Sequence, residues 1–149
     1  MSEPVLIQGG MGVAVSNWRL AREVSLAGQL GVVSGTLLDV VMSRRLQDGD
    51  PGGHILRALE KFPDRLIANE IIDRYYIEGG KPKGSPYKLL PMHGMTPERF
   101  LTEITVAANF VEVFLAKEGH DGLVGINYLE KIQLPTLPSL FGALLAGVD

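Results

Sequence analysis

A glycine-rich segment near the N-terminus has the residue types and position of a ligand-binding loop. Residues 8–12 (Gln-Gly-Gly-Met-Gly) directly follow a short apolar run. Glycines at the end of a buried strand allow backbone N–H groups to approach a flat ring or a phosphate without a Cβ in the way. A tight turn that binds no ligand would have the same composition, and the residues alone leave both interpretations open.

An asparagine inside an apolar run is the second candidate for binding chemistry. Asn127 lies within residues 123–129 (Leu-Val-Gly-Ile-Asn-Tyr-Leu), which read as a buried strand. A carboxamide there must find partners or cost roughly 1–3 kcal/mol. It offers both donors and an acceptor, which suits the polar edge of a flavin pyrimidine ring. The alternative is a core asparagine bonded to a neighbouring loop.

A dinucleotide-binding fingerprint is excluded. The triplet Gly10-Met11-Gly12 begins like G-x-G-x-x-G, but Val15 occupies the last position. The second expected strand ends in Ser-Gly-Thr, without the acidic residue that would hold a ribose. The glycine-rich segment therefore does not indicate NAD.

Other polar residues are expected to be structural. The histidines His54, His93 and His120 are scattered and lie near no motif for a metal or a nucleophile. Glu112 and Glu118 fall on a long predicted helix, where carboxylates are usually solvated. The chain has no cysteine, which excludes disulfides, thiolate zinc sites and cysteine nucleophiles. We therefore expect no metal site.

Composition and charge indicate a globular chain with no nucleic-acid or membrane partner. Hydrophobic residues make up 46% and charged residues 21%. Net charge is 14 − 17 = −3, and no basic stripe is present. The N-terminus does not resemble a signal peptide, and no apolar stretch reaches the roughly 18 residues that span a bilayer. The lack of cysteine fits a reducing compartment, so we predict a cytoplasmic protein.

Hydrophobic patterning predicts alternating strands and helices. Ser16 is expected to cap the first helix. Residues 78–96, with four glycines and three prolines, are predicted to form an irregular loop. Buried strands are expected at residues 4–8, 30–34 and 123–129, and helices after Ser16 to Gly28, at 37–47, 50–62, 65–75, 96–118 and 139–146.

This alternation predicts an α/β fold with a parallel sheet. Three strands and the beginning of a fourth at residues 147–149 amount to about half of a TIM (β/α)8 barrel. We therefore expect residues 1–149 to form one partial barrel domain, the N-terminal half, truncated where strand four begins. A small open doubly wound sheet is the alternative, and the pattern does not separate the two.

Several strings resemble the nitronate monooxygenase family, also known as 2-nitropropane dioxygenase. Residues 4–12 (Pro-Val-Leu-Ile-Gln-Gly-Gly-Met-Gly), 16–18 and 28–35 resemble the beginning of that family. Residues 124–128 and 130–139 are similar to a larger bacterial branch of it. The resemblance implies an FMN-binding TIM barrel that oxidises alkyl nitronates with O2.

The resemblance also implies roles for particular residues. Gly9, Gly10 and Met11 match the loop whose backbone touches the isoalloxazine ring, and Asn127 matches the asparagine that bonds the polar edge of the flavin. Two further residues that end the second strand would border the ring: Gly35 and Thr36. The family's catalytic histidine and its phosphate-binding loops would follow residue 149. We therefore expect an N-terminal fragment that is inactive by itself.

Two alternatives to a nitronate-oxidising enzyme stay open at this point. Flavin-dependent enoyl-thioester reductases share the barrel and the first-strand motif and use a nicotinamide cofactor. The family often has Ala-Pro-Met where this chain has Gly9-Gly10-Met11, which keeps substrate choice open. The chain could also be a truncated product without catalysis. In any of these cases we expect self-association through exposed barrel edges.

Overall fold

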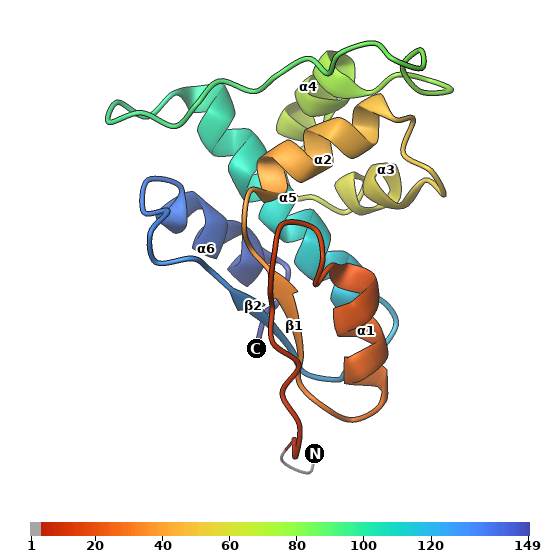
Figure 1. Ribbon diagram of the computed structural model, residues 1–149, viewed down its shortest axis with the longest axis vertical. Helices are drawn as coiled ribbons and strands as arrows, with labels where there is room; N and C mark the ends of the chain where they lie inside the picture. The colour runs from red at the N-terminus through yellow and green to blue at the C-terminus, as the bar shows by residue number, and fades with distance from the viewer. Residues whose placement is uncertain (1–3) are drawn as a thin grey trace.

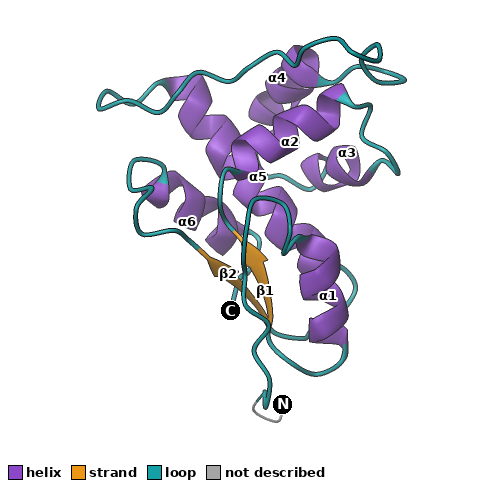
Figure 2. Ribbon diagram, in the orientation of Figure 1, coloured by secondary structure: helices purple, strands orange, loops and turns teal. Residues whose placement is uncertain are grey.

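The computed structural model describes residues 4–149 and shows a helix-rich α/β domain (Figure 1). Two short strands lie in one part of the molecule and three helices, α2, α3 and α4, pack in another, with α5 running through both (Figures 1 and 2). In chain order the elements are α1 (Trp18–Leu26), β1 (Gly31–Ser34), α2 (Leu38–Gln47), α3 (His54–Leu59), α4 (Arg65–Tyr75), α5 (Arg99–Lys117), β2 (Val124–Asn127) and α6 (Thr136–Leu145).

The helices begin and end close to where local signals place them. Asn17, rather than the predicted Ser16, caps α1, because its side chain accepts from the N–H groups of Arg19 and Leu20. Glu98 caps α5 in the same way, and Gly119 follows its end with φ +80°. No helix of the described chain combines the length and the apolar character needed to cross a membrane.

The sheet of the described residues consists of β1 and β2, which pair in parallel. Gly31 lies opposite Val124, and Ser34 lies opposite Asn127. The predicted first strand is reduced to one parallel bridge between Ile7 and Leu30. Its direction agrees with the prediction. Its length is shorter than predicted, because side chains such as that of Gln8 bond backbone groups that a longer strand would pair.

The prediction of half a TIM barrel was wrong. Across residues 4–149 only β1 and β2 are strands, and they form one two-stranded sheet beside six helices, of which α2 to α5 follow one another between the two strands. These helices pack on one another instead of alternating with strands, so the described residues form a small helix-rich domain around a two-stranded sheet. The predicted strand at residues 147–149 is also absent. Asp149 still bonds the beginning of β2, with its N–H 3.0 Å from the carbonyl oxygen of Val124.

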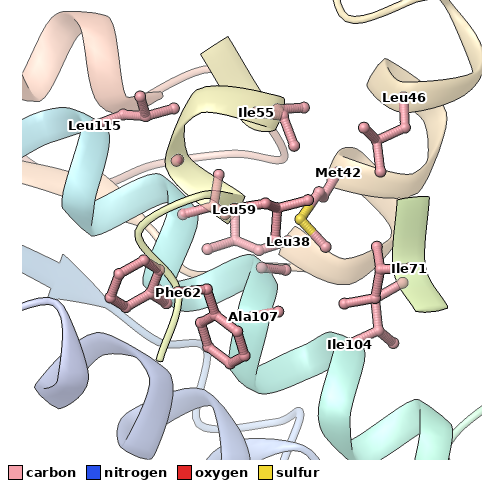
Figure 3. Close-up of a cluster of buried hydrophobic side chains, with 14 of the residues drawn as sticks. Leu38, Met42, Leu46, Ile55, Leu59, Phe62, Ile71, Ile104, Ala107 and Leu115 are labelled. Atoms are coloured by element: carbon pink, nitrogen blue, oxygen red, sulfur yellow. The ribbon is translucent and has the colours of Figure 1, made fainter. Parts of the chain in front are cut away.

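The hydrophobic core centres on α5, whose side chains meet those of the three preceding helices (Figure 3). Ile104 and Leu115 of α5 are fully buried, as are Leu46 of α2 and Leu59 of α3. Ile71 reaches the same cluster from α4. Apolar side chains around most of its circumference explain why α5 lies at the centre of the domain.

One carboxylate of α5 is buried in this core, contrary to the expectation that it is solvated. Oε1 of Glu112 accepts from the backbone N–H of Trp18 at 2.8 Å, and Oε2 lies 3.1 Å from Nη1 of Arg45. Burial raises the pKa of Glu112, while the charge of Arg45 and the bond from Trp18 oppose that rise. Glu112 therefore links the beginning of α1 to α2 across α5.

The N-terminal segment leaves apolar side chains in solvent, and we predict that it promotes self-association. Val5, Leu6 and Ile7 are 95%, 55% and 66% exposed. Because a strand edge with apolar side chains recruits other chains, Ile7→Lys should lower the light scattering of concentrated protein. Leu66→Lys is the control, since Leu66 is 80% exposed on α4. Equal scattering of wild type and Ile7→Lys would contradict the prediction.

Candidate functional site

The carboxyl ends of the parallel segments bring the predicted loop and the predicted asparagine together. Nδ2 of Asn127 donates to the carbonyl oxygen of Gly10 at 2.7 Å. The carbonyl oxygen of Asn127 accepts from the N–H of Gly35 at 2.9 Å. Residues far apart in sequence therefore meet at the edge where ligands of open parallel sheets usually bind.

The two neighbouring glycines of the loop have different surroundings. Gly10 is buried, and a Cβ there would lie 2.6 Å from the carbonyl oxygen of Val33 and 3.0 Å from Cβ of Asn127. Gly9 and Met11 are exposed, and Met11 is 67% exposed. Gly10 thus allows the loop to lie directly on β1, while its neighbours face outward.

Two side chains, Ser16 and Gln8, hold this loop in place, a role that their sequence context does not predict. The hydroxyl of the buried Ser16 donates to the carbonyl oxygen of Gly9 and accepts from the N–H of Met11, both at 3.0 Å. Oε1 of Gln8 accepts from the N–H of Val32 at 3.1 Å, which takes a backbone donor of β1 that a longer first strand would use. The loop is therefore ordered by its own polar side chains.

Tyr128, directly after Asn127, extends the polar network toward α5 and α6. Its hydroxyl lies 3.0 Å from Oδ1 of Asn109 and 2.9 Å from the carbonyl oxygen of Ser139. Burial raises the pKa of the Tyr128 phenol, so it stays a neutral donor at physiological pH. A Cβ at Gly35 would lie 2.4 Å from its ring, which shows how closely the ends of β1 and β2 pack.

Two adjoining cavities open beside these strand ends. The smaller, of about 30 Å³, is lined by Gly35, Thr36 and Tyr128 among others. The larger, of about 350 Å³, shares Asp39 and His93 with it and extends between α2 and two loops. Gly35 and Thr36 thus border a cavity, whereas the other four predicted flavin residues, Gly9, Gly10, Met11 and Asn127, lie outside both cavities.

The shared wall of the two cavities contains an Asp–His pair. Nε2 of His93 lies 3.0 Å from Oδ2 of Asp39, and Oδ1 of Asp39 accepts from the N–H of Val40 at 2.8 Å. The Asp39 side chain is 6% exposed and lies in the first turn of α2, where the helix dipole favours a negative charge. The sequence predicts a structural role for His93, since no motif lies near it, and Asp39 stands 54 positions earlier in the chain.

The long irregular loop is held against α2 at several points. Residues 76–98 contain no helix or strand. The buried Gln47 accepts from the N–H of Lys88 at 2.7 Å and donates to its carbonyl oxygen at 3.1 Å. With the Asp39–His93 contact, this fixes residues 88–93 along α2 as one wall of the larger cavity.

The other two histidines each contact residues of neighbouring helices. Nε2 of His120 lies 2.7 Å from the carbonyl oxygen of Ala116, near the end of α5. The ring of His54 packs against Trp18, with centroids 5.0 Å apart, and burial lowers its pKa. The sequence offers no signal that distinguishes His93 from these two.

The described residues show no metal centre, and the comparisons with known proteins show no family. Across residues 4–149, no group of three or more histidine or acidic side chains could hold a metal ion. Comparison of the chain with protein-family models, with curated proteins and with solved structures finds no match. The strand ends and the adjoining cavities are therefore the features from which function is inferred.

Proposed function

We propose that the strand ends of this chain bind the ring of FMN, as part of an FMN-dependent oxidation of alkyl nitronates with O2. The observation that carries the proposal is the 2.7 Å hydrogen bond between Asn127 and the carbonyl oxygen of Gly10. It unites the two segments that the resemblance to nitronate monooxygenases independently associates with the flavin ring. The barrel is not part of this proposal.

The residues at the strand ends fit one edge of an isoalloxazine ring. The contact with Gly10 uses one Nδ2 hydrogen of Asn127, which leaves the second hydrogen and Oδ1 for a ligand. Asn127 is exposed, so these groups are accessible. The exposed Gly9 has only Cγ of Met11 near its Cβ position, at 3.8 Å, so its backbone is open to a flat ring.

When bound, the flavin would supply the redox chemistry, by taking electrons from the substrate before O2 reoxidises it. In this proposal Asn127 recognises the pyrimidine edge, and the Gly9–Met11 backbone supports the ring. Ser16 is a positioning residue, because it holds the loop through Gly9 and Met11. In the resemblance, neither Asn127, Ser16 nor the Gly9–Met11 loop corresponds to the catalytic histidine. We therefore expect these residues to bind flavin without catalysing turnover.

Flavin binding is tested by titrating the purified chain into FMN or riboflavin and recording flavin fluorescence. We expect both flavins to bind with similar Kd, because the proposed contacts involve the ring rather than the phosphate. Asn127→Ala should weaken binding about 5- to 10-fold, as expected for the loss of one or two hydrogen bonds. Oxygen uptake on addition of an alkyl nitronate should stay at the level of free FMN.

Asn109→Ala is the matched control, because Asn109 also belongs to the polar network but lies on α5, beyond Tyr128. Its flavin Kd should match that of the wild type once both are shown to be folded by circular dichroism. Equal weakening by both variants would indicate a general structural effect. No change in flavin fluorescence with wild-type protein would overturn the proposed function.

A further inference from the structure

The cavity of about 350 Å³ beside α2 has a polar end and apolar walls. Its size falls within the range of small-molecule sites. Asp39 and His93 provide the polar end, and Lys131 and Gln133 also line the cavity. Most of the remaining lining is apolar and comes from α2 and two loops: Leu37, Val40, Leu90, Met92, Ile132 and Leu134.

The Asp39–His93 pair fixes the orientation of the imidazole. Asp39 is held by the N–H of Val40, and its other oxygen faces Nε2 of His93 at 3.0 Å. A carboxylate accepts only, so Nε2 carries the hydrogen, and in the neutral form of imidazole the other ring nitrogen, Nδ1, has a lone pair that can accept a hydrogen bond. Within residues 4–149 the side chain of His93 makes this one hydrogen bond, so Nδ1 is available as an acceptor.

Backbone strain at the same wall is a second, independent feature. Leu37, which ends the turn after β1, has φ +53° and ψ +39°, a left-handed conformation that costs a leucine free energy. Non-glycine residues in this region concentrate at functional sites, where the surrounding structure imposes the conformation. Leu37 lines both cavities beside Asp39.

We propose that this cavity is a binding site for a small molecule with an apolar body and one hydrogen-bond-donating head, such as a phenol. The head donates to Nδ1 of His93, and the body contacts the apolar side chains of α2 and the 88–93 segment. Asp39 is a positioning residue that acts through His93. The site does not depend on flavin binding.

The test uses 4-propylphenol as the probe and 4-propylanisole as its match without the O–H group. NMR spectra of the whole chain follow the ring Cε1–H signals of its three histidines during titration. We expect 4-propylphenol to shift the signal of His93 and leave those of His54 and His120 unchanged. The anisole should bind about 5- to 10-fold more weakly, which corresponds to one hydrogen bond.

Two variants separate the polar and apolar contributions. His93→Phe should bind the phenol and the anisole equally, because the acceptor is lost. Val40→Trp should abolish binding of both, because the indole fills the cavity. His54→Phe is the control and should bind like the wild type, since His54 lines a different cavity with Trp18 and Asp50.

The comparison of phenol and anisole on wild-type protein needs no variant, so a folding defect cannot obscure the result. Equal affinity of the two probes, or shifts at His54 or His120 in place of His93, would overturn the proposed site. If the wild-type chain bound the phenol but no flavin, only the proposed flavin function would be refuted, and the proposed cavity site would stand.

Discussion

Replacing Glu112 with alanine should lower the free energy of unfolding by about 3 kcal/mol. Removal of one partner of a buried ion pair leaves the other uncompensated, at a cost of roughly 3–5 kcal/mol. The lower end applies, because the Arg45 side chain is 26% exposed and can be partly rehydrated. The change also leaves the N–H of Trp18 at the beginning of α1 without its carboxylate. Urea denaturation monitored by circular dichroism measures the effect.

Glu118→Ala is the matched control for this prediction. Glu118 also pairs with an arginine, Arg57, at 2.8 Å, but both side chains are more than a third exposed. Exposed pairs contribute about 0–1 kcal/mol, so Glu118→Ala should change stability little. If the two variants lost the same stability, burial of the Glu112 pair would not be the reason for its effect.

The pH dependence of stability offers a second measurement on Glu112. Burial raises its folded-state pKa above the ordinary value of 4.5. As pH rises above 4.5, the Glu112 carboxyl loses its proton in the unfolded chain before it does so in the folded chain. The contribution of Glu112 to stability therefore falls until the pH passes the folded-state pKa. Relative to Glu112→Gln, which does not titrate, the wild type should lose stability across that window. A constant difference between the two would contradict the raised pKa.

Replacing Gly31 with alanine should lower the free energy of unfolding by about 3 kcal/mol or more, the upper end for an overpacked core. A Cβ at Gly31 would lie 1.9 Å from the carbonyl oxygen of Ala21 and 2.9 Å from its Cα. These are backbone atoms of α1, so the helix would have to move away from β1. Urea denaturation measures the change, and loss of near-ultraviolet circular dichroism would report a chain that no longer packs.

Gly125→Ala provides the control, because Gly125 is also a glycine within a strand, in this case the partner strand β2. Its nearest neighbour would be Cγ2 of Val32 at 3.4 Å, an ordinary contact. Alanine also reduces the entropy of the unfolded chain, so this variant should have nearly wild-type stability. Equal losses at Gly31 and Gly125 would show that the close approach of α1 to β1 is not the cause.

The local signals in the sequence predicted the helices and the two central strands, β1 and β2, but overestimated the first strand. The helix of residues 65–75 was predicted with its observed bounds, Arg65–Tyr75, because a cap and an apolar face are encoded within a few residues. A strand needs a partner, and pairing depends on residues far along the chain. The apolar run at residues 4–8 therefore had the composition of a strand, yet the side chains of Gln8 and Gln29 take up donors of the pairing edge.

By itself the sequence determined which residues with binding chemistry stand at the ends of apolar runs. Tertiary structure decided which of these residues contact one another. Asn127 and Gly10 were both selected from sequence, and parallel pairing along β1 brings them into contact. For His93 the sequence predicts a structural role, and for Glu112 a solvated one. Only the packing of the 88–93 segment and of α1 gives them a buried partner, since burial depends on elements that are distant in sequence. The same dependence explains why the barrel prediction was wrong: residues 4–8 and 147–149 were expected to be strands, but the first segment forms a single bridge and the second forms no strand.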